Sequence, residues 1–259
     1  LRGLVRHQRD HLAQVQRRAA ADDPRAILPY SYAGTMGLVQ RHAGHPFFHR
    51  LGASRLERTI CSPAKDYGWK AVMGSTLVPH PDEAAKSDFI ILWGTNALAT
   101  NIHFLQIVRK AKQQGARVWL IDTYETPTAA AADRVILVKP GSDGALALSM
   151  MQVMVREGWV DKDFVGRHVH GFEPFKDTLS DYGPEAVSEI TGLTPAVIVE
   201  LAKAYAQAKA PFISLGSGLS RYANGAMTVR CITCLPALSG AWQKPGGGML
   251  SSISTGPAF

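Results

Sequence analysis

The sequence predicts an α/β fold, a three-layer sandwich around a mainly parallel sheet, on the basis of three features of its middle. Apolar runs at residues 89–93, 118–121 and 135–138 have the length and composition of strands buried on both faces. Apolar residues recur at helical spacing between the first two runs, and Gly115 ends that helix. This order is typical of parallel strands joined by right-handed crossovers. With a fourth run at 212–215, we expect all four strands in one sheet.

The remaining elements are predicted from the same periodicities. In the first part of the chain we expect an amphipathic helix at 4–20, a strand at 26–32, and a loop followed by a helix within 34–52. Later helices are expected at residues 145–157, 185–190, 195–207 and 224–238. Residues 161–183 are rich in Asp, His and Gly and predict an irregular surface excursion, and the GGG at 246–248 predicts a flexible segment.

Composition excludes several classes of protein. The 259 residues carry a formal net charge of +7, spread along the chain without a basic stripe interleaved with aromatics, so nucleic acid is not an expected partner. A binding site for an anionic cofactor explains the excess of positive charge better. No apolar run approaches membrane-spanning length, and three cysteines give no disulfide framework. The chain begins at Leu1 instead of Met, so we expect its native N-terminus upstream, and targeting signals do not decide its compartment.

Four strand ends carry clusters of small and polar residues, where ligands bind in open parallel sheets. The clusters are Gly94, Thr95 and Asn96; Asp122 and Thr123; Gly141, Ser142 and Asp143; and Gly216, Ser217 and Gly218. Asp122 can accept hydrogen bonds from a ribose or a guanine edge, and the helix that opens after Gly141 can hold phosphate. The alternative is that these residues only make turns and caps. No GxGxxG or Walker-type loop is present, so an ordinary NAD or ATP site is not indicated.

Cysteines and histidines offer few further sites. Cys61 precedes an expected helix and could be a metal ligand or an activated nucleophile, or a buried inert thiol. Cys231 and Cys234 form a CxxC without a second pair inside an apolar helical run, which predicts core packing. No carboxylate or cysteine completes a ligand pattern with the three histidines of the first part, His42, His45 and His49.

Seven segments form an ordered set of motifs along nearly the whole chain. They are WGTN at 93–96, GARVWLID at 115–122, TPTAAAAD at 126–133, KPGSDGALAL at 139–148, WVDKDFV at 159–165, ITGL at 190–193 and NGAMTVRCITCLPALSGAWQKPGGG at 224–248. This set resembles the molybdopterin oxidoreductase superfamily, which includes dimethyl sulfoxide reductases, formate dehydrogenases and periplasmic nitrate reductases. One departure is Tyr124-Glu125, where relatives continue with Pro-Arg.

The resemblance implies a bis-molybdopterin guanine dinucleotide cofactor that holds molybdenum or tungsten. Cys61 stands at the spacing from Gly68 and Gly74 at which relatives carry the metal ligand, so it is the implied metal ligand and catalytic residue. The strand-end clusters would then surround one pterin guanosine diphosphate. The implied activity is oxygen-atom or hydride transfer on a small-molecule substrate, with electrons passed to or from a partner protein or subunit.

The resemblance also implies a division of the chain. Residues 1–57 would be part of one α/β domain whose remainder lies beyond residue 259, and residues 58–259 would form a Rossmann-like cofactor-binding domain. An iron–sulfur cluster is expected only in a missing N-terminal part, so we expect the isolated chain to be inactive. The alternative is a metal-free homologue with a structural or electron-transfer role, as in the large iron–sulfur subunit of respiratory complex I. A thiolate at Cys61 favours the enzyme, because a scaffold has no need of one there.

Overall fold

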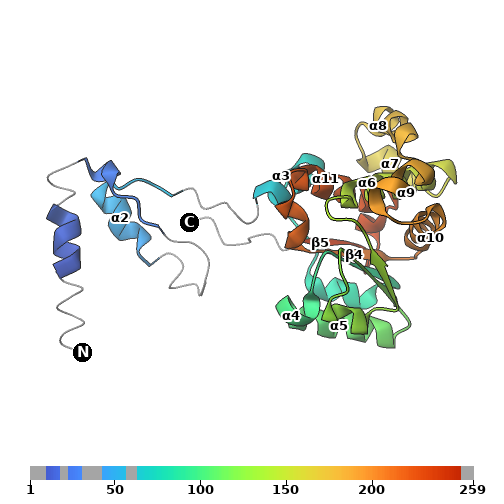
Figure 1. The fold of residues 1–259 in the computed structure, drawn as a ribbon, viewed down its shortest axis with the longest axis horizontal. Helices are drawn as coiled ribbons and strands as arrows, with labels where there is room; N and C mark the ends of the chain where they lie inside the picture. The colour runs from blue at the N-terminus through green and yellow to red at the C-terminus, as the bar shows by residue number, and fades with distance from the viewer. Residues whose placement is uncertain (1–9, 18–22, 31–42, 57–62, 252–259) are drawn as a thin grey trace. The chain divides into compact units, whose positions relative to one another are not determined.

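A computed structural model describes residues 10–17, 23–30, 43–56 and 63–251 of the chain (Figure 1). The chain divides into two compact units, Leu1–Ile60 and Cys61–Phe259. In the first unit, residues 10–17 are helical and are followed by η1 (Pro24–Ala26) and α2 (His45–Leu51).

The strand expected at residues 26–32 is wrong for its described part. The Asp23 carboxylate accepts a hydrogen bond from the Arg25 backbone N–H at 3.0 Å, and Pro24 stands at the first position of the 3₁₀ turn that follows. After this turn, the Ile27 carbonyl accepts one bond from the Ser54 N–H at 3.0 Å. This single backbone hydrogen bond joins residues 27 and 54 but does not form the series of bonds that defines a β-strand.

The second unit is built on a five-stranded parallel sheet with the order β3-β2-β1-β4-β5. Its strands are β1 (Phe89–Trp93), β2 (Arg117–Asp122), β3 (Arg134–Leu137), β4 (Pro211–Leu215) and β5 (Gly248–Ser251). The prediction that the four apolar runs share one sheet is confirmed. The fifth strand was not predicted, because the GGG at its start has the composition of a loop. Gly248 has a φ of +114°, and a methyl group there would lie 3.2 Å from the Trp242 ring.

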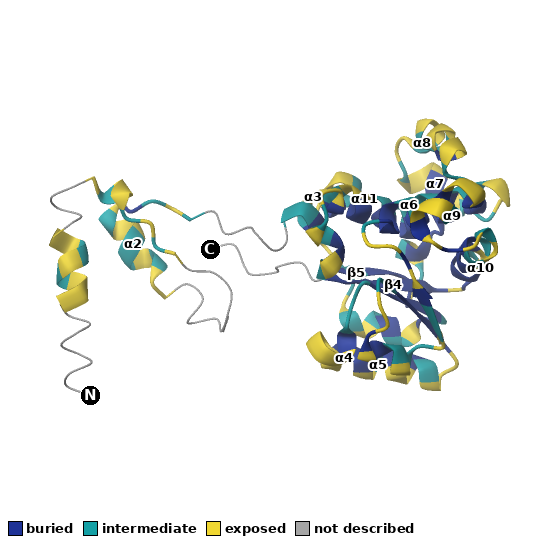
Figure 2. Cartoon of the chain, viewed as in Figure 1, coloured by how far each residue is buried: buried dark blue, intermediate teal, exposed yellow. Residues whose placement is uncertain are grey.

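Helices cover both faces of the sheet, which confirms the three-layer sandwich (Figure 1). Alternate residues of β1 face opposite layers: Phe89, Ile91 and Trp93 pack in one core, and Ile90 and Leu92 pack in the other. Every residue of β1 and β4 is buried, whereas the edge strand β3 is partly exposed, as are the outer helix faces (Figure 2). One face is covered by α4 (Ala97–Thr100) and α5 (Ile102–Gln113), and the other by α3 (Pro63–Met73), α6 (Asp143–Arg156), α9 (Pro184–Thr191), α10 (Pro195–Ala206) and α11 (Gly225–Leu238). Among the described residues, no helix is long and apolar enough to span a membrane.

The segment at 161–183 is helical, so the predicted irregular excursion is wrong. It contains α7 (Lys162–His168), α8 (Phe172–Thr178) and η4 (Leu179–Tyr182). The Asp161 side chain caps α7 by accepting from the Phe164 N–H at 3.0 Å, and Leu179 is buried. Each of these helices has at most two turns, so its few apolar residues do not form a recognisable helical repeat among the polar ones. The remaining connections are the short helices η2 (Pro81–Lys86), η3 (Pro127–Ala131), η5 (Ser217–Arg221) and η6 (Ala241–Gln243).

The order of the strands creates a topological switch point between β1 and β4. From β1 the chain proceeds to β2 and β3 on one side, and then crosses back through α6, α9 and α10 to β4 on the other side. Connections therefore leave the carboxyl ends of β1 and β4 in opposite directions, which opens a crevice at that edge.

Candidate functional site

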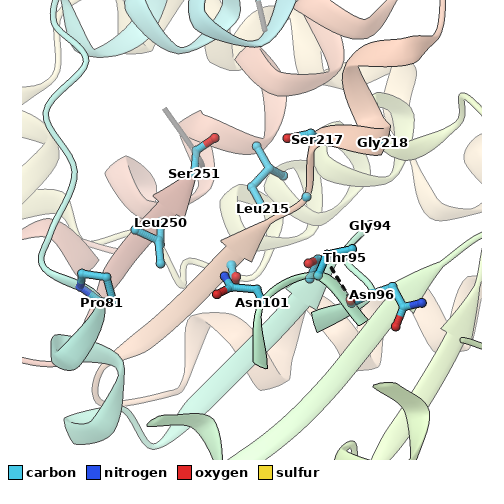
Figure 3. A pocket seen from close by; sticks show the side chains of 13 residues that line it. Pro81, Gly94, Thr95, Asn96, Asn101, Leu215, Ser217, Gly218, Leu250 and Ser251 are labelled. Carbon is cyan, nitrogen blue, oxygen red and sulfur yellow. Dashed lines mark hydrogen bonds between the residues drawn. The ribbon is translucent and has the colours of Figure 1, made fainter. Parts of the chain in front are cut away.

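Two cavities open at the carboxyl edge of the sheet, on either side of the loop that follows β1. The large cavity, of about 640 Å³, lies over the ends of β1, β4 and β5. Figure 3 shows Leu215 and Ser251 on one side of it and Thr95 and Asn101 on the other. The small cavity, of about 230 Å³, lies beside the ends of β1 and β2; its wall includes Asp122, Thr123, Tyr124, Thr126, Asp143 and Tyr222. Gly94, Asn96 and Gly218 contribute to both cavities.

A backbone partition separates the two cavities. The Gly216 N–H donates to the Trp93 carbonyl at 2.7 Å, and a methyl group on Gly216 would lie 1.7 Å from the Gly94 carbonyl oxygen. Gly94 has a φ of +59°, and a methyl group there would lie 2.9 Å from Leu219. The absence of side chains at Gly94 and Gly216 is therefore a steric requirement of the protein itself.

The large cavity has a neutral polar wall with a buried lysine beside it. Lys65, on α3, is 1% exposed, and its Nζ lies 3.3 Å from Ser217 Oγ. Helix α3 is held there by close packing on α11, since a methyl group on Gly68 would lie 2.1 Å from the Ala226 carbonyl oxygen. Burial lowers the pKa of Lys65, and the nearby Arg221 guanidinium lowers it further, against the raising effect of Asp66. This arrangement favours an anionic group near Ser217.

The small cavity is acidic. The Trp93 indole Nε1–H donates to Asp143 Oδ1 at 2.8 Å, and in the described part of the chain the buried Asp143 Oδ2 has no hydrogen-bond partner. Burial raises the pKa of Asp143, and the Asp122 carboxyl adds to that rise, while the Trp93 bond opposes it. Burial also raises the pKa of Asp122, whose Oδ1 accepts from the Thr123 N–H at 2.8 Å. Two carboxyls in one small cavity are suited to a ligand that donates hydrogen bonds.

Gly141 and Ser142 form the turn that starts α6. The Ser142 N–H and hydroxyl both donate to the Lys139 carbonyl, at 3.2 and 2.6 Å, and the Asn224 side-chain amide donates to the Gly141 carbonyl at 2.9 Å. Asp143 belongs to the wall of the small cavity, but these two residues belong to neither cavity wall. Phosphate binding by the backbone around Ser142 therefore stays a prediction.

Cys61 lies outside the described residues, so its role as metal ligand also stays a prediction. Cys231 and Cys234 lie on α11 and pack against the core, as predicted, and burial raises the pKa of Cys234 to about 12. His42 lies outside the described residues, and His45 and His49 lie on α2. Within the described ranges, no group of three His, Cys, Asp or Glu side chains could hold a metal ion.

Sequence reasoning missed several wall residues. Thr126 and Tyr222 come from turns that no strand-end rule selects, and only the fold brings them to Asp143. Ser251 follows the rule but was missed because β5 was not predicted. Lys65 was missed too, because the sequence does not show that this lysine is buried with its ammonium group beside Ser217.

Comparisons with known proteins show which family the sequence matches. The sequence profile of the family "Molybdopterin oxidoreductase" matches residues 13–256. Probable oxidoreductase YoaE of Bacillus subtilis (strain 168) is 41% identical over 230 residues, covering 88% of this chain and 34% of that protein. Formate dehydrogenase H of Escherichia coli (strain K12) is 34% identical over 168 residues, covering 65% of this chain and 24% of that protein.

A solved structure shows the same fold. Acetylene hydratase from Pelobacter acetylenicus superimposes with a TM-score of 0.74 at 23% sequence identity, covering 92% of this chain and 33% of that chain. The chain spans about a third of the length of YoaE (34%) and of acetylene hydratase (33%), and about a quarter of formate dehydrogenase H (24%).

Proposed function

The chain belongs to the molybdopterin oxidoreductase family, and from that premise we propose that it is the cofactor-binding core of a molybdenum or tungsten oxidoreductase. The cofactor would be bis-molybdopterin guanine dinucleotide, and the whole protein would transfer an oxygen atom or a hydride equivalent to or from a small molecule. Electrons would pass to or from a partner protein or subunit, and an iron–sulfur cluster would lie in a part of the protein outside this chain.

The observation that carries this proposal is the buried Oδ2 of Asp143, a residue of the small cavity's wall, which has no hydrogen-bond partner among the described residues. A buried polar atom without a partner is rare in folded proteins, and a ligand that donates a hydrogen bond would satisfy it. The guanine edge presents N–H donors, which match the acceptors of Asp122 and Asp143. The backbone around Ser142 would hold one phosphate, as the sequence predicts, and the buried Lys65 beside Ser217 favours a further phosphate contact there.

The chain's own residues would bind and orient the cofactor. When bound, the group supplies the two-electron chemistry at its metal. Cys61 would hold the metal as a thiolate, the form of cysteine that binds metals. Asp122 and Asp143 would fix the guanosine end, and the partition at Gly94 and Gly216 would set the path between the two cavities.

The test is guanosine nucleotide released on denaturation of the full-length protein. Asp122→Ala should lower the nucleotide released per chain, whereas Asp181→Ala, an exposed aspartate on η4, should leave it unchanged. Equal release from the wild type and Asp122→Ala would contradict the role of Asp122.

Metal analysis decides between the enzyme and the metal-free alternative. The full-length protein should contain molybdenum or tungsten, and Cys61→Ala should keep the fold and the pterin while it abolishes most turnover. A full-length protein without either metal would favour the structural or electron-transfer homologue. The isolated chain should carry little or no molybdenum.

A further inference from the structure

Tyr222 is held against the start of α6, beside the small cavity. Its backbone carbonyl accepts from the Gly225 N–H at 2.9 Å, just before α11 begins. A methyl group on Gly141 would lie 3.7 Å from Tyr222 Cγ, so the phenol ring lies against the backbone of that turn. The ring is half-buried and forms part of the cavity wall. It is thus a positioned aromatic surface that the motifs above do not include.

Thr126 gives the same cavity a second polar group that lacks a protein partner. It is 2% exposed and stands at the N-terminal boundary of η3, yet its side chain makes no capping hydrogen bond. In the described part of the chain, Thr126 Oγ1 is buried without a hydrogen-bond partner, like Asp143 Oδ2. Since neither atom has a partner among the described residues, a ligand in the cavity would be a source of one for each.

The combination selects a class of ligand. A phosphate would be repelled by Asp122 and Asp143, and an apolar group would leave Asp143 Oδ2 and Thr126 Oγ1 unsatisfied. A planar heterocycle with N–H donors can stack on an aromatic ring and hydrogen-bond at its edge at the same time. The volume of about 230 Å³ limits the occupant to a small group of this kind.

We propose that Tyr222 is the stacking platform and Thr126 a hydrogen-bonding partner for a purine base in the small cavity. This rests on the proposed function, which makes that base the guanine of the cofactor. Tyr124 is the second aromatic residue of the wall, but it is 61% exposed and no helix start holds it, so it contributes less.

Calorimetric titration of the 259-residue chain with guanosine 5′-diphosphate tests the proposal. Tyr222→Leu removes the ring and should weaken binding roughly tenfold, since base–aromatic stacking has effects of that size. Tyr222→Phe keeps the ring and should bind within about twofold of the wild type, because stacking does not need the hydroxyl. Thr126→Val keeps the shape without the hydroxyl and should weaken binding roughly fivefold.

The outcomes separate the two proposals. Binding by the wild type with no loss in Tyr222→Leu would overturn the stacking role while leaving the nucleotide site intact. An equal loss of affinity in Tyr222→Leu and Tyr222→Phe would also overturn it. Phe keeps an aromatic ring that can stack and Leu does not, so a stacking role predicts a loss in the Leu variant only. No binding of the nucleotide by the wild type would overturn the proposed guanosine site and this inference with it. Unchanged binding by Thr126→Val would remove Thr126 from the proposal.

Discussion

The two cavities share one sheet edge but differ in charge. The wall of the large cavity contains no ionisable side chain among the described residues, and Lys65 lies behind its Ser217. The small cavity contains Asp122 and Asp143. The difference follows from the switch point: β2 and α6 bring carboxyls to one side of β1, while α3 brings an ammonium group to the side of β4. A parallel sheet can thus present two opposite environments a few residues apart, and an elongated ligand with one anionic end would bind in one direction only.

Gly216→Ala should give the largest effect, because it breaks the partition between the cavities. The added methyl group would lie 1.7 Å from the Gly94 carbonyl oxygen, and backbone cannot move aside as a flexible side chain can. We expect the free energy of unfolding to fall by about 3 kcal/mol, at the upper end for overpacked sites. Urea unfolding measures it. The matched control is Gly218→Ala, whose methyl group would lie 3.7 Å from the same oxygen; a similar loss there would show that the partition is not the cause.

Asp143→Asn should weaken binding of the guanine base in the small cavity. The amide oxygen can still accept from the Trp93 indole, but Oδ2, which has no hydrogen-bond partner among the described residues, is replaced by an NH₂ donor. Affinity for guanosine and for guanosine 5′-diphosphate should fall together, by roughly 10- to 100-fold, since a charged hydrogen bond is lost. Titration with both ligands measures this, and a loss confined to the diphosphate would contradict the assignment of the base to this cavity.

Lys65→Met should weaken binding of the phosphates near Ser217 without affecting binding of the base. The aliphatic part of the side chain is kept, but the ammonium group near Ser217 is removed. Guanosine 5′-diphosphate should bind roughly tenfold more weakly, through the loss of a charge-assisted contact, while guanosine should bind as before. Equal losses for both ligands would indicate a change in the fold instead of a lost phosphate contact, and circular dichroism would then show it.

The smallest expected effect is a pH dependence of stability without ligand. Burial raises the pKa of Asp143 above its unfolded value of about 4, so the folded state binds this proton more tightly. The stabilising contribution is present below the unfolded pKa and is lost as pH rises through the folded pKa. Between pH 4 and pH 7 the free energy of unfolding of the wild type should therefore fall by more than that of Asp143→Asn. Urea unfolding at both pH values measures the difference, and parallel losses would contradict it.

The sheet was predictable because its strands are short apolar runs, and in the central strands β1 and β4 every residue is buried. Strand β5 was not predicted because three glycines precede its two large residues, Met249 and Leu250. The glycines are typical of a loop, and two apolar residues are too few to indicate a strand. Asp122 and Asp143 could be selected because Asp122 ends a strand and Asp143 begins a helix near the carboxyl edge. Tyr222 and Thr126 could not, because their separation of nearly a hundred residues is closed only by the crossover through α6, α9 and α10.

The bond between the Trp93 indole and Asp143 has an optical consequence. The indole is fully buried, and its N–H is held 2.8 Å from a carboxylate oxygen that belongs to the cavity wall. Indole emission responds to the charge and polarity of its hydrogen-bond acceptor, so any group that enters the small cavity and engages Asp143 changes the surroundings of this chromophore. The protein therefore carries an intrinsic reporter of occupancy at the cavity, readable without a label.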